Sequence, residues 1–173
     1  MRSARRRSRE FALQAMYQWQ LAGQSLADIE KQYADMEGFA RADVKLFSAL
    51  VTGVMKHADQ LKEQLVPHID REWSEVSPVE RAVMLIGAFE LTHMPETPYR
   101  VIINEAIELA KSFGGTDGHK YVNGILDKIA AGVRAEEISF QGTNPPAAAK
   151  VAVAKPEKKA PTVVTRARRV VKP

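Results

Sequence analysis

Apolar residues recur every three to four positions from the start of this chain to about Ile138, the spacing of a helix with one buried face. The first predicted helix buries a stripe made of Phe11, Ala12, Ala15, Met16, Trp19 and Ala22, and it ends at Gly23. A second begins at Ser25 and buries Leu26, Ile29, Tyr33 and Met36. A third, long helix carries Val44, Phe47, Leu50, Val51, Val54, Ala58, Leu61 and Leu65, and Pro67 stops it.

The second half of the chain repeats this pattern. Ser77-Pro78-Val79-Glu80 has the serine, proline and glutamate of a helix start, and Val83, Ile86 and Phe89 follow as its buried face. The next helix contains Val101, Ile102, Glu105, Ala106, Leu109 and Phe113, and the last runs from about Asp117 with Val122, Ile125, Leu126, Ile129 and Val133 inward. No segment alternates with the period of a strand. We therefore predict an all-α fold of six or seven helices in two small antiparallel bundles, divided between Pro67 and Ser77.

Two glycines, Gly53 and Gly124, lie inside helical patterns, where each costs about 1 kcal/mol relative to alanine. We expect close helix packing at both. From about Gly142 the composition changes to Ala, Pro, Lys and Val, with five of the nine prolines. We predict a helical domain over residues 1–141 and a disordered basic tail over residues 142–173.

Charge is distributed unevenly along the chain. Residues 1–10 hold five arginines and one glutamate, residues 11–141 have a net charge of −7, and residues 142–173 have a net charge of +7. Such a distribution places contact with a polyanion at the ends and leaves the acidic body free to meet a basic protein.

Candidate catalytic and metal-binding patterns do not meet their own requirements. The four histidines have no metal-ligand spacing, and the run from Gly114 to Lys120 lacks the phosphate-loop spacing and a preceding strand. Glu105 and Glu108 are expected on a solvated helix face. The chain has no cysteine, no signal peptide and no apolar run long enough for a membrane helix, so we expect a cytoplasmic protein that is not an enzyme and needs no cofactor or metal.

The arginine cluster is the strongest functional signal from the residues alone. Arg2, Arg5, Arg6, Arg7 and Arg9 fall within eight positions, and arginine binds phosphate in a two-pronged geometry and stacks on bases. Lysine is the usual solubilising residue, so five arginines favour an anionic ligand, although a solvated basic end stays open as the alternative. Tyr17 and Tyr121 are candidates for stacking on single-stranded RNA, with core packing about equally favoured.

Three segments resemble the NusB family of bacterial transcription antitermination factors. These are Arg5-Arg6-Arg7-Ser8-Arg9-Glu10 with Ala15-Met16-Tyr17-Gln18-Trp19, the run from Val101 to Gly114, and His119-Lys120-Tyr121-Val122-Asn123-Gly124-Ile125-Leu126-Asp127. The resemblance covers roughly residues 2–135 and leaves out the segment after Ser139.

The resemblance implies an all-helical protein that binds boxA RNA of ribosomal RNA leader transcripts together with NusE, a small-subunit ribosomal protein. This complex joins the RNA polymerase elongation complex and suppresses premature termination. By the same resemblance, the RNA-binding residues are Arg5, Arg6, Arg7, Arg9, Tyr17, Asp117, Lys120 and Tyr121, and Glu80 is the candidate contact to NusE.

Two other functions stay open at this point. One is an RNA-recruiting domain like that fused to some ribosomal RNA cytosine methyltransferases, although this chain lacks their length and catalytic cysteine. The other is a protein-interaction module that forms a homodimer through a helix face.

Overall fold

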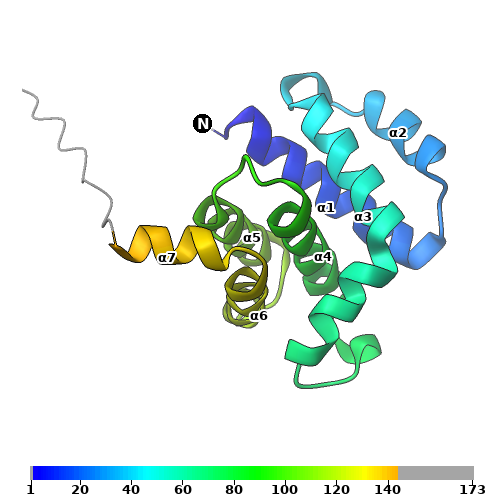
Figure 1. Cartoon of the computed structure of the whole chain (residues 1–173). Helices are drawn as coiled ribbons and strands as arrows, with labels where there is room; N and C mark the ends of the chain where they lie inside the picture. The colour runs from blue at the N-terminus through cyan, green and yellow to red at the C-terminus, as the bar shows by residue number, and fades with distance from the viewer. Residues whose placement is uncertain (1, 144–173) are drawn as a thin grey trace, which may run out of the picture.

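The computed structural model describes residues 2–143, and these form seven α-helices without a strand. The helices are α1 (Ala4–Ala22), α2 (Leu26–Ala34), α3 (Val44–Leu65), α4 (Pro78–His93), α5 (Tyr99–Phe113), α6 (Gly118–Val133) and α7 (Ala135–Thr143) (Figure 1). Short 3-10 turns lie at Phe39–Arg41, Val66–His68 and Trp73–Glu75. The all-α prediction is confirmed, and no described helix is long and apolar enough to cross a membrane.

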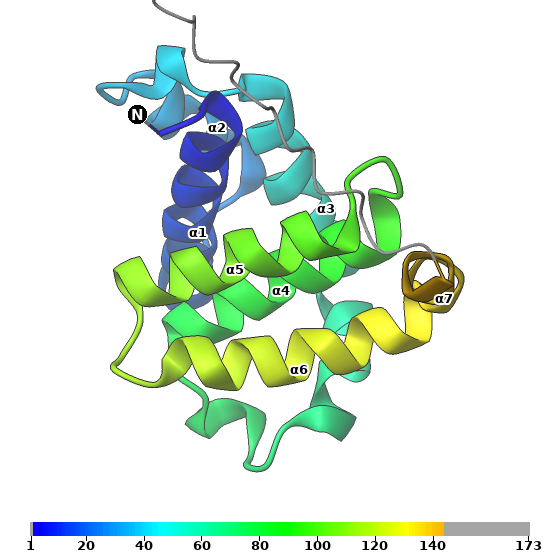
Figure 2. The ribbon, with the colours of Figure 1, turned by 90° about the vertical axis from the view of Figure 1, so that its left-hand side faces the viewer.

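Helix α4 lies at the centre of the fold. All ten residues from Ala82 to Leu91 are buried, so this helix contacts neighbours on every side. Figure 2 shows α4, α5 and α6 lying side by side while α1 crosses them steeply. Helices α1–α3 and α4–α6 are the two predicted groups, but a single apolar core runs through both.

Local signals set the helix ends where the sequence predicted them. Gly23 ends α1 with a φ of 63°, in the left-handed region that glycine tolerates best. The Ser25 and Ser77 side chains accept hydrogen bonds from the amides of Asp28 and Glu80, at the starts of α2 and α4. Each of these interactions spans three residues, which is why sequence alone could locate them.

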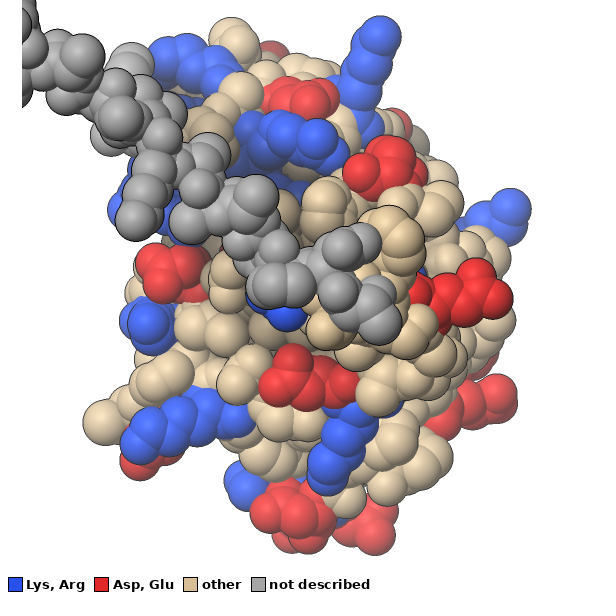
Figure 3. All heavy atoms as spheres, turned by 60° about the vertical axis from the view of Figure 1, so that its left-hand side comes forward, with Lys and Arg blue, Asp and Glu red and all other residues tan. Residues whose placement is uncertain are grey.

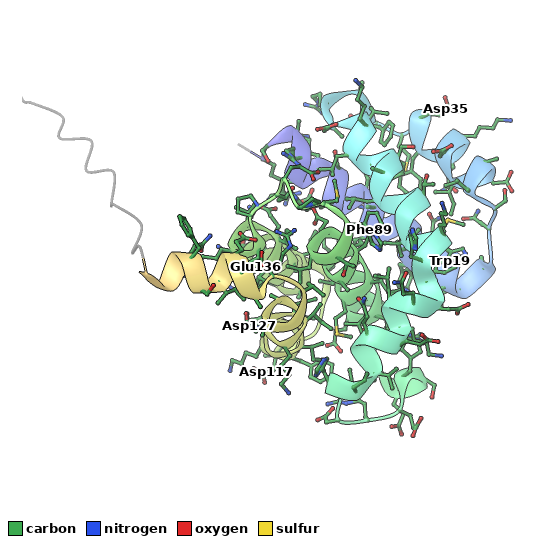
Figure 4. The ribbon with its side chains drawn as sticks, viewed as in Figure 1. Trp19, Asp35, Phe89, Asp117, Asp127 and Glu136 are labelled. Carbon is green, nitrogen blue, oxygen red and sulfur yellow. The ribbon has the colours of Figure 1, made fainter. Side chains whose placement is uncertain are left out.

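The two helical glycines differ. A Cβ at Gly53 would overlap the ring of Phe89, which Figure 4 shows between α3 and α4, so close packing is confirmed there. A Cβ at Gly124 would meet no other atom within 4 Å, so close packing is the wrong explanation for that residue.

Other predicted details also need correction. Val44 and Val133 were expected inward but are 47% and 42% exposed, because each lies at a helix end beyond its buried turns. Ala22 is likewise exposed. The last helical stretch breaks at Arg134, whose φ of −125° and ψ of 27° separate α6 from α7.

Arg134 is buried and holds this break in place. Its guanidinium donates to four main-chain carbonyls around the C-terminal end of α4 and to one carboxylate at the start of α7. The acceptors are the carbonyls of Leu91 (2.6 Å), Met94 (2.9 Å), Thr97 (3.2 Å) and Glu90 (3.3 Å) and the carboxylate of Glu137 (2.7 Å). Helix α7 continues to Thr143, two residues past the predicted domain boundary; the rest of the predicted tail lies outside the described residues.

Candidate nucleic-acid interface

Arg9 lies inside the fold and not on its surface. Its guanidinium donates to both carboxylate oxygens of Glu90 on α4, at distances from 2.6 to 3.2 Å, and the two side chains are only 3% and 2% exposed. Burial opposes the charged form, but the hydrogen bonds and charge of Glu90 outweigh it and raise the pKa of Arg9. Arg9 therefore fastens α1 to α4, and its burial removes it from the surface that RNA could reach.

Arg6 lies halfway between this interior and the surface. Its Nε and Nη2 atoms donate to the Glu105 carboxylate on α5 at 3.1 and 3.4 Å, and Glu108 lies 4.0 Å from Nη2. The hydrogen bond to Glu105 is the main reason that the pKa of Arg6 is raised. Glu105 and Glu108 were expected on a solvated face. Glu108 is exposed as expected, whereas Glu105 is partly buried and holds Arg6 against α5.

Arg5 and Arg7 remain available at the start of α1. Arg5 is exposed and reaches Thr97 through one weak hydrogen bond of 3.4 Å, and Arg7 is half-buried without an ion pair to any described residue. Basic side chains gather over the upper part of the face in Figure 3, interleaved with acidic ones. Of the five arginines in the predicted cluster, Arg6 and Arg9 are turned inward to carboxylates on other helices and Arg5 and Arg7 are turned outward. The fifth, Arg2, is exposed and pairs with Glu10 at 3.1 Å.

Tyr17 lines a hollow of about 370 Å³ further along α1. Its side chain is 39% exposed, as is that of Phe113 at the end of α5. The buried Tyr33 donates its hydroxyl to the Gln18 amide oxygen at 2.7 Å, at the edge of the same hollow. Sequence analysis singled out Tyr17 but missed Gln18 and Phe113, because only the fold brings α1, α2 and α5 together here.

The turn between α5 and α6 contains the remaining candidates. Asp117 and Lys120 form an exposed ion pair of 3.1 Å. Tyr121 is half-buried, and the guanidinium of Arg71 lies over its ring at 4.7 Å from the centroid. Sequence analysis missed Arg71, which is 50 positions away from Tyr121 and has no motif to mark it.

Asp70 completes this arrangement by pairing with Arg71 at 2.9 Å. The hydrogen bond from Arg71 lowers the pKa of Asp70. Burial, followed by the nearby Asp70 charge, raises the pKa of Tyr121. The face of Tyr121 under Arg71 is therefore already occupied by a guanidinium within this protein.

Glu80 lies beside the same turn, in the first turn of α4. A Cβ at Gly118 would come within 2.6 Å of Glu80 Oε1, so the carboxylate packs closely on the start of α6. The structure therefore brings the candidate partner residue next to the turn at Asp117, whose position Figure 4 marks.

Two hollows along α1 lead from the arginine cluster to Tyr17. One is lined by Arg2, Arg6, Glu105 and Ser112, and the next by Tyr17, Val79 and Phe113. Because Glu10 in the first lining and Gln14 in the second are one helical turn apart on α1, the hollows follow each other along that helix. An all-helical fold with exposed arginine, tyrosine and lysine side chains on α1 and at the turn between α5 and α6 defines a small helical protein with a candidate nucleic-acid-binding surface.

The chain belongs to the NusB family, because the sequence model of that family matches residues 6–131. It is 55% identical over 138 residues to the transcription antitermination protein NusB of Dechloromonas aromatica, which covers 80% of this chain and 85% of that protein. The NusB protein of Bordetella pertussis is 55% identical over 141 residues, which covers 79% of this chain and 92% of that protein.

Solved structures agree on the fold. T. maritima NusB superimposes with a TM-score of 0.69 at 25% identity and covers 80% of this chain and 99% of that one. A NusB chain crystallised with NusE and double-stranded RNA has a TM-score of 0.66 at 20% identity and covers 75% of this chain and 97% of that one.

These relatives also decide one of the two open alternatives, the methyltransferase domain. They are named as transcription antitermination proteins, which agrees with the prediction of a protein that is not an enzyme. Because the match covers 85% of the Dechloromonas protein, it is a match to nearly a whole antitermination protein and not to a domain of a longer methyltransferase.

Proposed function

We propose that this chain is a transcription antitermination factor that binds boxA RNA of ribosomal RNA leader transcripts together with NusE. The complex joins the RNA polymerase elongation complex and suppresses premature termination. The observation that carries the proposal is the outward position of Arg5 and Arg7 on α1 of a NusB-family chain. The names of the relatives support the process, and the related NusB structure with NusE and RNA supports the partners.

The RNA-binding surface in this proposal consists of Arg5, Arg6 and Arg7, followed by Tyr17 and then Asp117, Lys120 and Tyr121. Arg9 is left out because it is 3% exposed and bound to Glu90. Arginine and lysine neutralise phosphates, and Tyr17 offers an exposed ring to a base. Asp117 holds Lys120 by their ion pair and so orients its ammonium group.

A paired substitution of the outward arginines tests RNA binding. Replacing Arg5 and Arg7 with alanine removes two phosphate contacts, so the slope of log affinity against log salt should fall by roughly 1 to 1.5. Gel shifts of boxA RNA with NusE, at several salt concentrations, measure this. Alanine at Lys128, an exposed cation on α6, is the control. An unchanged slope in the double variant would contradict the proposal.

Glu80 is the residue that we propose meets NusE. The change Glu80→Lys reverses its charge beside the start of α6 and should weaken binding to a basic ribosomal protein. Calorimetry with purified NusE measures the affinity, and the melting temperature shows whether the fold survives. Equal affinity for both proteins would remove Glu80 from the interface. Size-exclusion chromatography with and without boxA RNA tests the remaining alternative, a homodimer that does not bind RNA.

A further inference from the structure

A further hollow lies where the C-terminal end of α1 meets the second half of α3 and the start of α4. It measures about 370 Å³, which is within the range of ligand-binding pockets. The half-buried indoles of Trp19 and Trp73 line it, and Figure 4 marks Trp19 beside α3. The chain has only these two tryptophans, so every indole of the protein lies at this hollow.

Two cations line the hollow without a carboxylate partner. Neither Lys62 of α3 nor Arg81 of α4 forms an ion pair with a described residue. Arg81 is half-buried, its Nε has no hydrogen-bond acceptor among the described residues, and its guanidinium lies 6.0 Å from the centroid of the Trp73 ring. Arg9 and Arg134, by contrast, are each bound to a carboxylate. Because buried polar groups are nearly always paired, Arg81 calls for an acceptor from outside the chain.

Arg81 faces other neighbours than Glu80, the proposed contact to NusE. Consecutive helical residues point about 100° apart. Glu80 packs on Gly118 at the start of α6, whereas Arg81 lines the hollow together with residues of α1 and α3. A segment bound in the hollow and a protein bound at Glu80 would therefore meet different sides of α4.

The charges of the lining match a single carboxylate. Lys62 and Arg81 carry two positive charges and Asp59 carries one negative charge, so the lining has a net charge of +1. A phosphate monoester carries roughly two negative charges at neutral pH and would leave one of them uncompensated beside Asp59. A carboxylate balances the lining, and guanidinium groups bind carboxylates in a two-pronged geometry.

Gln20 adds a feature that suits a peptide. Its Nε2 donates to the carbonyls of Met16 at 3.2 Å and Pro78 at 3.1 Å, which fixes the amide between α1 and α4. Its Oε1 accepts no hydrogen bond from a described residue and is left as an acceptor at the hollow. A peptide offers main-chain N–H donors, and tryptophan and arginine are the residues most enriched at the centres of protein–protein interfaces.

We propose that this hollow binds a short segment of a partner protein that carries an aromatic or aliphatic side chain next to an aspartate or glutamate. The apolar side chain packs against Trp19 and Trp73, and the carboxylate binds Arg81 and Lys62. Gln20 Oε1 accepts a main-chain N–H of the segment. This is a second protein-binding surface, beyond the proposed contacts with RNA and NusE.

Tryptophan fluorescence of the full chain tests the proposal, because both indoles line the hollow. The probe is the tetrapeptide serine-phenylalanine-glutamate-serine with both ends blocked, and the comparison peptide has glutamine in place of glutamate. The glutamate peptide should change the emission in a saturable way. It should bind about tenfold more tightly than the glutamine peptide, the equivalent of 1.4 kcal/mol.

Two arginine variants show whether the preference comes from the hollow. Arg81→Met keeps an unbranched apolar stem but removes the charge, so the two peptides should bind within about twofold of each other. Arg100→Met is the matched control, because Arg100 is an exposed arginine that also lies over a neighbouring ring, that of Tyr99, but on α5. It should keep the tenfold preference. Lys62→Met changes an exposed residue of the lining and should reduce the preference in part.

Several outcomes would overturn the proposal. These are the absence of a saturable change in emission, equal affinities for the two peptides, or an equal loss of preference in Arg81→Met and Arg100→Met. Displacement of the glutamate peptide by inorganic phosphate at constant ionic strength would show an anion site of a different kind. Displacement by purified NusE would assign the hollow to the NusE interface. The measurement uses no RNA, so its failure would leave the proposed RNA binding untouched.

Discussion

The start of α1 and the turn between α5 and α6 present similar side chains in different settings. At the start of α1, long-range bonds decide which arginines face outward, because Arg9 is bound to Glu90 81 positions away. At the turn, the pair of Asp117 and Lys120 spans three positions and both side chains are about three-quarters exposed. A charged residue in the first region serves folding or binding according to its depth, whereas at the turn Asp117 and Lys120 stay exposed to solvent although they pair with each other.

The largest expected effect comes from breaking the buried pair. The change Arg9→Met leaves the Glu90 carboxylate buried without a partner, which should lower the free energy of unfolding by about 3–5 kcal/mol. Urea unfolding measures this loss. Arg7→Met, two residues earlier on the same helix, should change stability by no more than about 0.5 kcal/mol.

A double variant checks the cause. Replacing Arg9 with methionine and Glu90 with leucine removes both charges, so it should recover most of the lost stability. Recovery would show that the single change is costly because it isolates a buried charge. If Arg9→Met alone changes the free energy of unfolding by less than about 1 kcal/mol, the buried pair does not stabilise the fold. The two regions would then differ in exposure but not in their contribution to stability.

An intermediate effect is expected from the two tyrosines, Tyr17 further along α1 and Tyr121 at the turn. Tyr121→Ala removes a half-buried ring and its contact with Arg71, and should cost about 1–2 kcal/mol of stability. Tyr17→Ala should cost no more than about 0.5 kcal/mol, because that ring is exposed. Thermal unfolding compares them, with Tyr121→Phe as the control that keeps the ring. Equal losses for both alanine variants would mean that Tyr17 also belongs to the core.

The smallest expected effect is on the pH dependence of stability, through Asp70 beside the turn. The pKa of Asp70 is lowered in the folded protein by Arg71, so its ionised form favours the fold above the unfolded value of about 3.9. This contribution is lost as the pH falls through the lower, folded value. Melting temperatures between pH 5 and pH 3 should fall slightly less steeply for Asp70→Asn. A carboxyl resonance of Asp70 that titrates at its ordinary pKa would contradict the arrangement with Arg71 and Tyr121.

Sequence predicted those parts of the fold that depend on near neighbours. The caps at Ser25 and Ser77 and the end at Gly23 are decided within four residues, and each was placed correctly. Helix α4 was only partly predicted, because a helix that is buried on all sides has no polar face to set a period. The break at Arg134 was missed for a similar reason, since its cause is a set of carbonyls about 40 positions earlier.

The candidate site shows the same limit. Composition located the arginine cluster and Tyr17, but the depth of each arginine depends on Glu90 and Glu105, which lie on other helices. The contact between Arg71 and Tyr121 likewise joins segments that have no common pattern. Spacing along α1 indicates which residues share a face, whereas only the packed helices show which face is buried.

The bonds of Arg134 have a consequence for the order in which the chain can mature on the ribosome. The carbonyls at the end of α4 are synthesised about 40 residues before the side chain that binds them. At 5–20 residues per second, that interval lasts roughly two to eight seconds. During this time the central helix has been synthesised, but the side chain that binds its last carbonyls has not. A nascent chain stalled before Arg134 should therefore hold α4 less firmly than one released a few codons later.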